Sequence, residues 1–98
     1  MSRKAVFTPA AKQDLREARN WYEGERQGLG LEFLNEVQRA TMRLESQAEQ
    51  FATVHRQTRL CPVKRFPYII VFHIVGDLVE ILAVFHAHRD PRDWKQRT

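Results

Sequence analysis

Two histidines, His86 and His88, are the side chains whose types and spacing most directly suggest chemistry. Residues i and i+2 of a strand point to the same face, so a strand here sets two imidazoles side by side. Such a pair can bind a metal ion or act as acid and base at a ribose 2′-hydroxyl. A metal would want a third ligand, and Asp90 is the only near one, so we predict neither a metal nor a cofactor. A catalytic pair and two partly exposed hydrogen-bonding side chains remain as alternatives.

Two basic clusters in the second half of the chain are candidate binding sites for phosphate or carboxylate. The first contains His55, Arg56, Arg59, Lys64 and Arg65, and the second contains Arg89, Arg92, Lys95 and Arg97, with Trp94 among them. Basic side chains beside an aromatic ring can grip phosphates and stack a base. Asp90 and Asp93 halve the charge of the second cluster. The alternative is therefore a short amphipathic tail whose Trp94 packs against the body of the protein.

The net charge of +4 arises entirely in the second half of the chain. Residues 1–50 carry eight basic and eight acidic side chains, whereas residues 51–98 carry eight basic and four acidic ones. Arginine, whose planar fork suits carboxylates and phosphates, outnumbers lysine twelve to four. This balance predicts an acidic partner, either a nucleic acid or an acidic protein segment, although ordinary solubilising charge explains it as well.

Length and composition narrow the class of protein. A chain of 98 residues with 43% hydrophobic and 29% charged residues predicts one globular domain spanning residues 1–98. No apolar run approaches the ~20 residues that span a bilayer, and no apolar segment near the N-terminus resembles a signal peptide. The single cysteine, Cys61, excludes an internal disulfide and a cysteine-based zinc site. These features lead us to expect a cytoplasmic protein without a membrane partner.

The first half of the chain predicts a short strand followed by a helical hairpin. Residues 3–7 are a strand candidate, and Thr8-Pro9 reads as a helix N-cap followed by proline at the first helical position. Apolar residues then recur at helical spacing in two runs, Ala11, Leu15, Ala18 and Trp21 or Tyr22, then Phe33, Leu34, Val37 and Leu44. Glycines between the runs predict a short connection, and hence two antiparallel helices.

The second half predicts antiparallel strands at residues 58–63, 68–75 and 78–87. Pro62 makes the first an edge strand or a bulged one, and Gly76-Asp77 suits a two-residue type II′ turn between the other two. The expected fold is therefore α+β: an N-terminal strand, an antiparallel helical hairpin, and a three-stranded antiparallel meander that forms one sheet with the first strand.

The predicted turn sets Val75 opposite Leu78 and sorts the side chains onto two faces. The face expected under the helices carries Tyr68, Ile70, Phe72, Ile74, Val79, Ile81, Ala83 and Phe85. The other face pairs Ile69 with Val84, Val71 with Leu82, His73 with Glu80, Pro67 with His86 and Arg65 with His88. We assign His73 and Glu80 a structural cross-strand contact. The rest of this second face is apolar in the middle and basic at one end, and we expect it to be an open docking surface.

The chain as a whole resembles the RelE/ParE toxin superfamily of type II toxin–antitoxin systems, nearer the ParE branch. The resemblance rests on three blocks: Phe7-Thr8-Pro9 with Trp21-Tyr22, the segment from Val63 through Arg65-Phe66-Pro67-Tyr68 to Phe72, and the segment from Ile81 through Val84-Phe85-His86 to Arg89-Asp90-Pro91. It implies the α+β fold predicted above and a cognate antitoxin whose acidic or amphipathic C-terminal segment wraps the toxin. ParE-type members poison DNA gyrase, and RelE-type members cleave mRNA on the ribosome.

The resemblance implies that the chain is a toxin, that it inhibits gyrase by binding, and that it forms a hetero-oligomer with its antitoxin. Residues expected to contact the target are Arg89, Arg92, Trp94 and Lys95, and those expected to contact the antitoxin are Arg59, Arg65, Ile69, Val71, Leu82 and Val84. The alternative is an mRNA endonuclease, ribosome-dependent or free, in which Arg65 and Arg89 hold the scissile phosphate and His86 or His88 transfers protons. RNA-cleaving members often carry a tyrosine in the C-terminal segment, and here none follows Tyr68. A third alternative is a module of little toxicity, kept for autoregulation of its operon.

Overall fold

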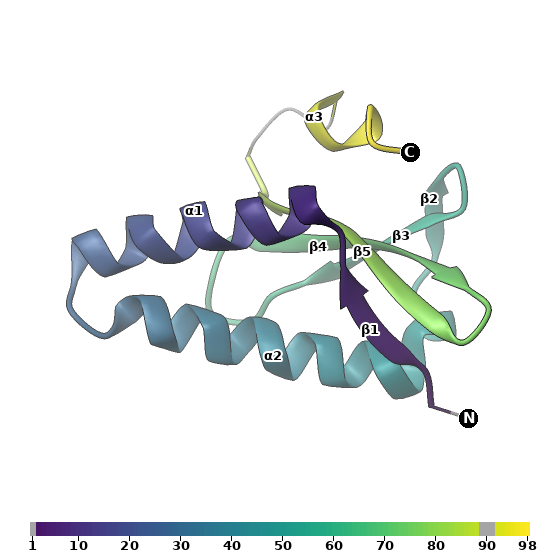
Figure 1. Cartoon of the computed structure of the whole chain (residues 1–98), viewed down its shortest axis with the longest axis horizontal. Helices are drawn as coiled ribbons and strands as arrows, with labels where there is room; N and C mark the ends of the chain where they lie inside the picture. The colour runs from purple at the N-terminus through teal and green to yellow at the C-terminus, as the bar shows by residue number, and fades with distance from the viewer. Residues whose placement is uncertain (1, 89–91) are drawn as a thin grey trace.

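The computed structural model, which describes residues 2–88 and 92–98, places a helical hairpin against a mixed sheet (Figure 1). The elements are β1 (Lys4–Phe7), α1 (Pro9–Glu25), α2 (Leu29–Gln47), the 3-10 turn η1 (Ala48–Gln50), β2 (Thr53–His55), β3 (Thr58–Pro62), β4 (Tyr68–Val75), β5 (Leu78–His86) and α3 (Arg92–Lys95). The sheet order is β1-β5-β4-β3-β2, with β1 parallel to β5 and the other neighbours antiparallel. The predicted α+β fold is confirmed. No helix in the described ranges is long and apolar enough to cross a membrane.

The helical hairpin begins and turns where the sequence predicts. The Thr8 hydroxyl accepts a hydrogen bond from the Ala11 amide at 3.2 Å, and Pro9 occupies the first position of α1. Between the helices, Gly28 adopts a left-handed conformation with φ of 90°. At Gly30 the helices come so close that a Cβ atom would lie 2.9 Å from the Arg19 carbonyl oxygen. Glycine at this position therefore lets α1 and α2 pack at short distance.

The β4–β5 hairpin confirms the predicted turn and the first half of the predicted register. Gly76 has φ of 59°, as the first central residue of a type II′ turn requires, and Val75 lies opposite Leu78. His73 lies opposite Glu80, with its Nε2 2.5 Å from Oε1 of the carboxylate, so the predicted cross-strand pair is present.

From Val71 back to Tyr68, the predicted pairing of β4 with β5 is wrong, because a β-bulge inserts one extra residue into β5. Phe72 still lies opposite Ile81, but Val71 then pairs with Ala83 instead of Leu82. The shift continues along the strands, so Ile69 lies opposite Phe85, Ile70 opposite Val84 and Tyr68 opposite His86. Strict alternation cannot anticipate a bulge, and one extra residue moves every later side chain to the other face.

The bulge changes which face each side chain of β5 occupies. Val84 packs with the helices, together with Ile70, Phe72, Val79 and Ile81. Ala83 and Phe85, expected under the helices, instead lie on the opposite face with Val71 and Leu82. The observed pairing of β4 with β5 contains neither of two predicted pairs, Pro67 with His86 and Arg65 with His88.

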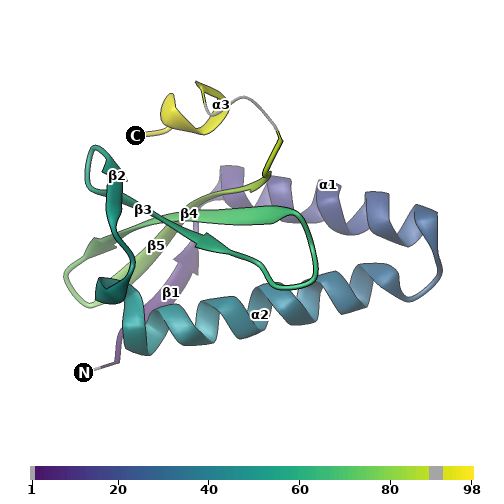
Figure 2. The same ribbon diagram turned by 180° about the vertical axis from the view of Figure 1, so that it is seen from behind.

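Three elements, η1, β2 and α3, were not predicted from the sequence. The short strand β2 pairs with β3 through a turn at Arg56 and Gln57, both of which have positive φ. The short helix α3 lies across the sheet from α2, and Figure 2 shows the strands between them. Its Trp94 is 3% exposed and packs on Val71, Leu82, Ala83 and Phe85. The face expected to be open is therefore covered by the chain's own C-terminal segment.

Candidate functional site

The C-terminal segment, residues 92–98, is held over the sheet by apolar contacts around one indole. The Trp94 ring centroid lies 5.9 Å from that of Phe85 and 6.1 Å from that of His55 in β2. The burial of this ring agrees with the alternative in which Trp94 packs against the body of the protein. A target base could stack only on an exposed indole, and this indole is covered. Its Nε1 is buried without a hydrogen-bond partner among the described residues.

A carboxylate on α1 fastens the same segment to the sheet. Asp14 Oδ2 accepts hydrogen bonds from Arg97 Nη1 at 2.6 Å and from the Val84 amide at 3.0 Å, and Oδ1 accepts from Arg97 Nη2 at 3.1 Å. Arg97 Nη1 also donates to the Leu82 carbonyl at 3.0 Å. The Asp14 carboxylate raises the pKa of Arg97 above its ordinary value. The sequence around Asp14 does not indicate this Asp14–Arg97 clamp, because the partners of Asp14 lie 70 and 83 residues away.

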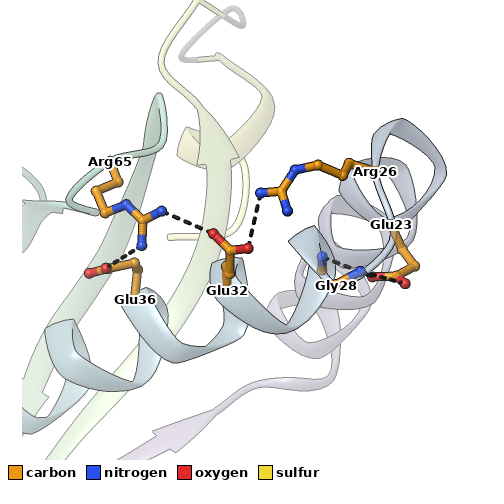
Figure 3. A network of polar contacts seen from close by, with 7 residues as sticks. Glu23, Arg26, Gly28, Glu32, Glu36 and Arg65 are labelled. Carbon is orange, nitrogen blue, oxygen red and sulfur yellow. Dashed lines mark hydrogen bonds and ion pairs between the residues drawn. The ribbon is translucent and has the colours of Figure 1, made fainter.

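Arg65, predicted to meet an antitoxin or a scissile phosphate, is paired within the chain (Figure 3). Its Nη2 lies 3.0 Å from Glu32 Oε1 and its Nη1 3.4 Å from Glu36 Oε2, both on α2. Arg26 meets the other oxygen of Glu32 at 3.0 Å, and these two arginines lower the pKa of that carboxyl. Two carboxylates thus compete with a phosphate or an acidic segment for this exposed fork.

Arg59 is also used inside the protein. Its Nη1 donates to the carbonyls of Phe51 at 2.7 Å and Glu49 at 3.0 Å, where the chain leaves η1 for the sheet. The carbonyls at the end of a helical segment lack internal partners, so this guanidinium acts as a cap.

The apolar residues predicted to contact an antitoxin are mostly inaccessible. Val71 and Leu82 are buried under α3, and Val84 is buried on the opposite, helix-facing side. Ile69 is half-buried at the margin of the covered face. The structure therefore does not bring these four side chains together on one exposed surface.

Two of the residues predicted to contact the target are exposed near the C-terminus. Arg92 and Lys95 are exposed on α3, and the Lys95 ammonium lies 5.9 Å from the centre of the Trp94 ring. Arg89 lies outside the described residues.

The two histidines lie side by side at the end of β5. Their ring centroids are 5.3 Å apart, and the His86 Nδ1 accepts a hydrogen bond from the His88 amide at 3.1 Å. Because Nδ1 is an acceptor here, the neutral His86 ring carries its proton on Nε2. The part of the chain that the structure describes contains no group of three side chains suited to a metal ion.

These histidines line a groove of about 550 Å³ between α1 and β5. Its other lining residues are Asp14, Glu17, Ala18, Trp21, Tyr22, Tyr68, Val84 and Phe85. Four successive ring contacts, with centroid separations of 5.1, 5.9, 5.4 and 5.3 Å, connect Trp21 through Tyr22, Tyr68 and His86 to His88. The helical spacing placed either Trp21 or Tyr22 on the apolar side of α1. Tyr22 is buried there, whereas Trp21 is 60% exposed at the margin of this groove.

Comparison with known proteins identifies relatives of the chain. The family model described as ParE toxin of type II toxin-antitoxin system, parDE, matches residues 5–91. Among solved structures, a chain described as the chromosomal ParDE TA system from P. aeruginosa superposes with a TM-score of 0.78 at 19% identity. The match covers 89% of this chain and 98% of that chain, and it shows a shared fold. No curated protein sequence matches.

Proposed function

Because the chain belongs to the ParE toxin family of type II toxin–antitoxin systems, we propose that it inhibits DNA gyrase by binding and that a cognate antitoxin neutralises it. The toxin of this pair would act in the cytoplasm, where its target lies, and would be stored as a hetero-oligomer with the antitoxin. The family match extends over β1, the helical hairpin and all the antiparallel strands, which supports a shared mode of action.

The observation that favours gyrase binding over RNA cleavage is that Arg65 forms ion pairs within the chain. An endonuclease needs a cation free to neutralise the phosphate in the transition state. Arg65 instead joins Glu32 and Glu36, and the bulge in β5 removes the predicted alignment of Arg65 with His88. The proposed phosphate-binding pair is thus reduced to Arg89, which lies outside the described residues.

The test is induced expression followed by separate measurements of DNA synthesis and transcript integrity. We expect DNA synthesis to stop first while transcripts remain intact, and purified protein to inhibit supercoiling by gyrase. A Glu25→Gln variant, altered on an exposed position of α1, is the matched control and should retain toxicity. Degraded transcripts with unaffected supercoiling would overturn the proposal.

RNA cleavage remains the second candidate because His86 and His88 share one groove with Tyr68 and Glu17. Imidazoles beside a carboxylate can serve as acid and base at a 2′-hydroxyl. This candidate predicts that purified protein, alone or with ribosomes, cleaves mRNA and that the cleavage depends on the imidazoles.

A further inference from the structure

The groove between α1 and β5 has a chemical character opposite to that of the rest of the protein. The chain carries a net charge of +4, yet no lysine or arginine is among the described residues that line the groove. Two carboxylates, Asp14 and Glu17, stand on its helical wall. Arg97 forms an ion pair with Asp14 and also attracts Glu17 at longer range, while Glu17 accepts a hydrogen bond from Gln13 at 3.0 Å. In the described part of the chain, the groove therefore presents one carboxylate, Glu17, that makes no direct salt bridge.

An exposed aromatic ring stands beside this carboxylate. Glu17 and Trp21 are four residues apart on α1 and so lie on the same side of the helix. Both line the groove, and the Trp21 ring is 60% exposed. A carboxylate next to an open indole face is the combination that attracts a guanidinium or ammonium group, through ion pairing and cation–π attraction.

The groove also borders an unpaired strand edge. β1 pairs with β5 only as far as Ile81, and beyond that point β5 has no neighbouring strand on this side among the described elements. The Val84 amide faces this edge, because it donates to Asp14. Alternation places the Val84 carbonyl and the His86 amide on the same edge. The Val84 carbonyl and the His86 amide can pair with the backbone of an added extended segment, while the Val84 amide stays bonded to Asp14.

We propose that this groove binds an extended segment of a partner protein that lies along the β5 edge, pairs with the backbone at Val84 and His86, and places a basic side chain between Glu17 and Trp21. In naming that partner as the antitoxin, the inference rests on the proposed function. It differs from the sequence-based expectation in two respects: the site is the α1–β5 groove rather than the face under α3, and the chemistry selects a basic rather than an acidic segment.

The test uses the isolated protein and two synthetic probes, the capped peptides Val-Arg-Val-Arg-Val and Val-Glu-Val-Glu-Val. Titration into isotope-labelled protein, followed by NMR, reports on the amides of Val84 and His86 and on the Trp21 indole. We expect the arginine peptide to shift these signals and to slow hydrogen exchange of the His86 amide. We expect the glutamate peptide to bind much more weakly.

Two variants distinguish the subsite from general charge attraction. Glu17→Gln should weaken binding of the arginine peptide by roughly threefold to tenfold, the range that loss of one partly exposed charged contact produces. Glu25→Gln removes the same charge near the end of α1, outside the groove lining, and should leave the affinity unchanged. Equal loss in both variants, preference for the glutamate peptide, shifts confined to other elements, or no saturable shift with the arginine peptide would each overturn the inference. The assay contains neither gyrase nor antitoxin, so its failure is distinguishable from failure of the proposed function.

Discussion

At the scale of single residues, the arginines expected to bind a partner are engaged by the protein's own groups. Arg65 joins two carboxylates on α2, and Arg59 caps the carbonyls of Glu49 and Phe51. Neither role was visible in the sequence, because an exposed-looking basic cluster does not show which acidic or carbonyl groups the fold brings to it. Of the residues predicted to contact the target, Arg92 and Lys95 are exposed on α3.

The histidines provide a residue-scale prediction that separates the two candidate functions. Loss of a general acid or base typically lowers a rate by 10²–10⁴-fold, whereas loss of one hydrogen bond in an interface costs about 1 kcal/mol. We therefore expect His86→Gln and His88→Gln to remain folded and to retain most of their toxicity. Growth arrest after induction measures the effect, with circular dichroism as the folding control. Complete loss of toxicity in a folded variant would favour the endonuclease.

Asp14 provides a second prediction at the same scale. Asp14→Asn can still accept from the Val84 amide but loses the charged contact with Arg97, which should destabilise attachment of the C-terminal segment by about 1–2 kcal/mol. Hydrogen exchange across residues 92–98 measures this attachment. Lys12→Gln, at an exposed position of α1, is the control. If exchange in Asp14→Asn matches that of the parent protein, the clamp contributes nothing.

At the scale of elements, the close approach of α1 and α2 depends on the absence of a side chain at Gly30. Gly30→Ala would place a Cβ atom 2.9 Å from the Arg19 carbonyl, so we expect a loss of about 1–3 kcal/mol in the free energy of unfolding. Gly24→Ala is the matched control, because nothing lies within 4 Å of that position in α1. It should leave stability unchanged or raise it by up to about 1 kcal/mol. Urea unfolding of both variants measures the difference, and equal stabilities would contradict the packing argument.

The turn between the helices should make stability depend on pH. Glu23 accepts hydrogen bonds from the amides of Gly28 and Gly30, which lower the pKa of its carboxyl below its ordinary value. Between the ordinary and the lowered pKa, the unfolded carboxyl binds a proton that the folded one excludes, so the free energy of unfolding falls as the solution is acidified toward the lowered pKa. Glu23→Gln should show a shallower fall than the parent protein, whereas Glu25→Gln should not. Denaturant titrations between pH 3 and pH 7 measure these slopes, and parallel curves for Glu23→Gln and the parent would refute the assignment.

At the scale of the whole molecule, the C-terminal segment determines which face of the sheet a partner can reach. It spans from the β2–β3 turn, where Arg56 donates to the Thr98 carbonyl at 3.3 Å, to α1, where Arg97 meets Asp14. Under it lie Val71, Leu82, Ala83 and Phe85. A partner on that face would have to displace the segment, whereas the α1–β5 groove is accessible without any such displacement.

Trp94→Ala tests this arrangement. Loss of the buried indole should detach residues 92–98 and expose the apolar residues beneath, while the α1–α2 core remains intact. We expect increased binding of a hydrophobic dye, rapid proteolysis confined to the C-terminus, and lower toxicity because the basic groups of α3 are no longer positioned. Unchanged dye binding and proteolysis would show that the indole is not the anchor.

Local sequence signals were enough to predict the longer helices and strands of this protein, but not β2 or α3. Thr8-Pro9, the helical spacing of apolar residues and Gly76-Asp77 act through local backbone and side-chain preferences, so the hairpin of helices and the β4–β5 turn could be predicted. The family resemblance rested on the same local blocks. The β5 bulge, the clamp of Asp14 on Arg97, and the pairing of Arg65 with α2 were decided only by the tertiary structure. Each depends on groups brought together from distant parts of the chain, and a shift of one residue in β5 was sufficient to exchange the faces of Val84 and Phe85.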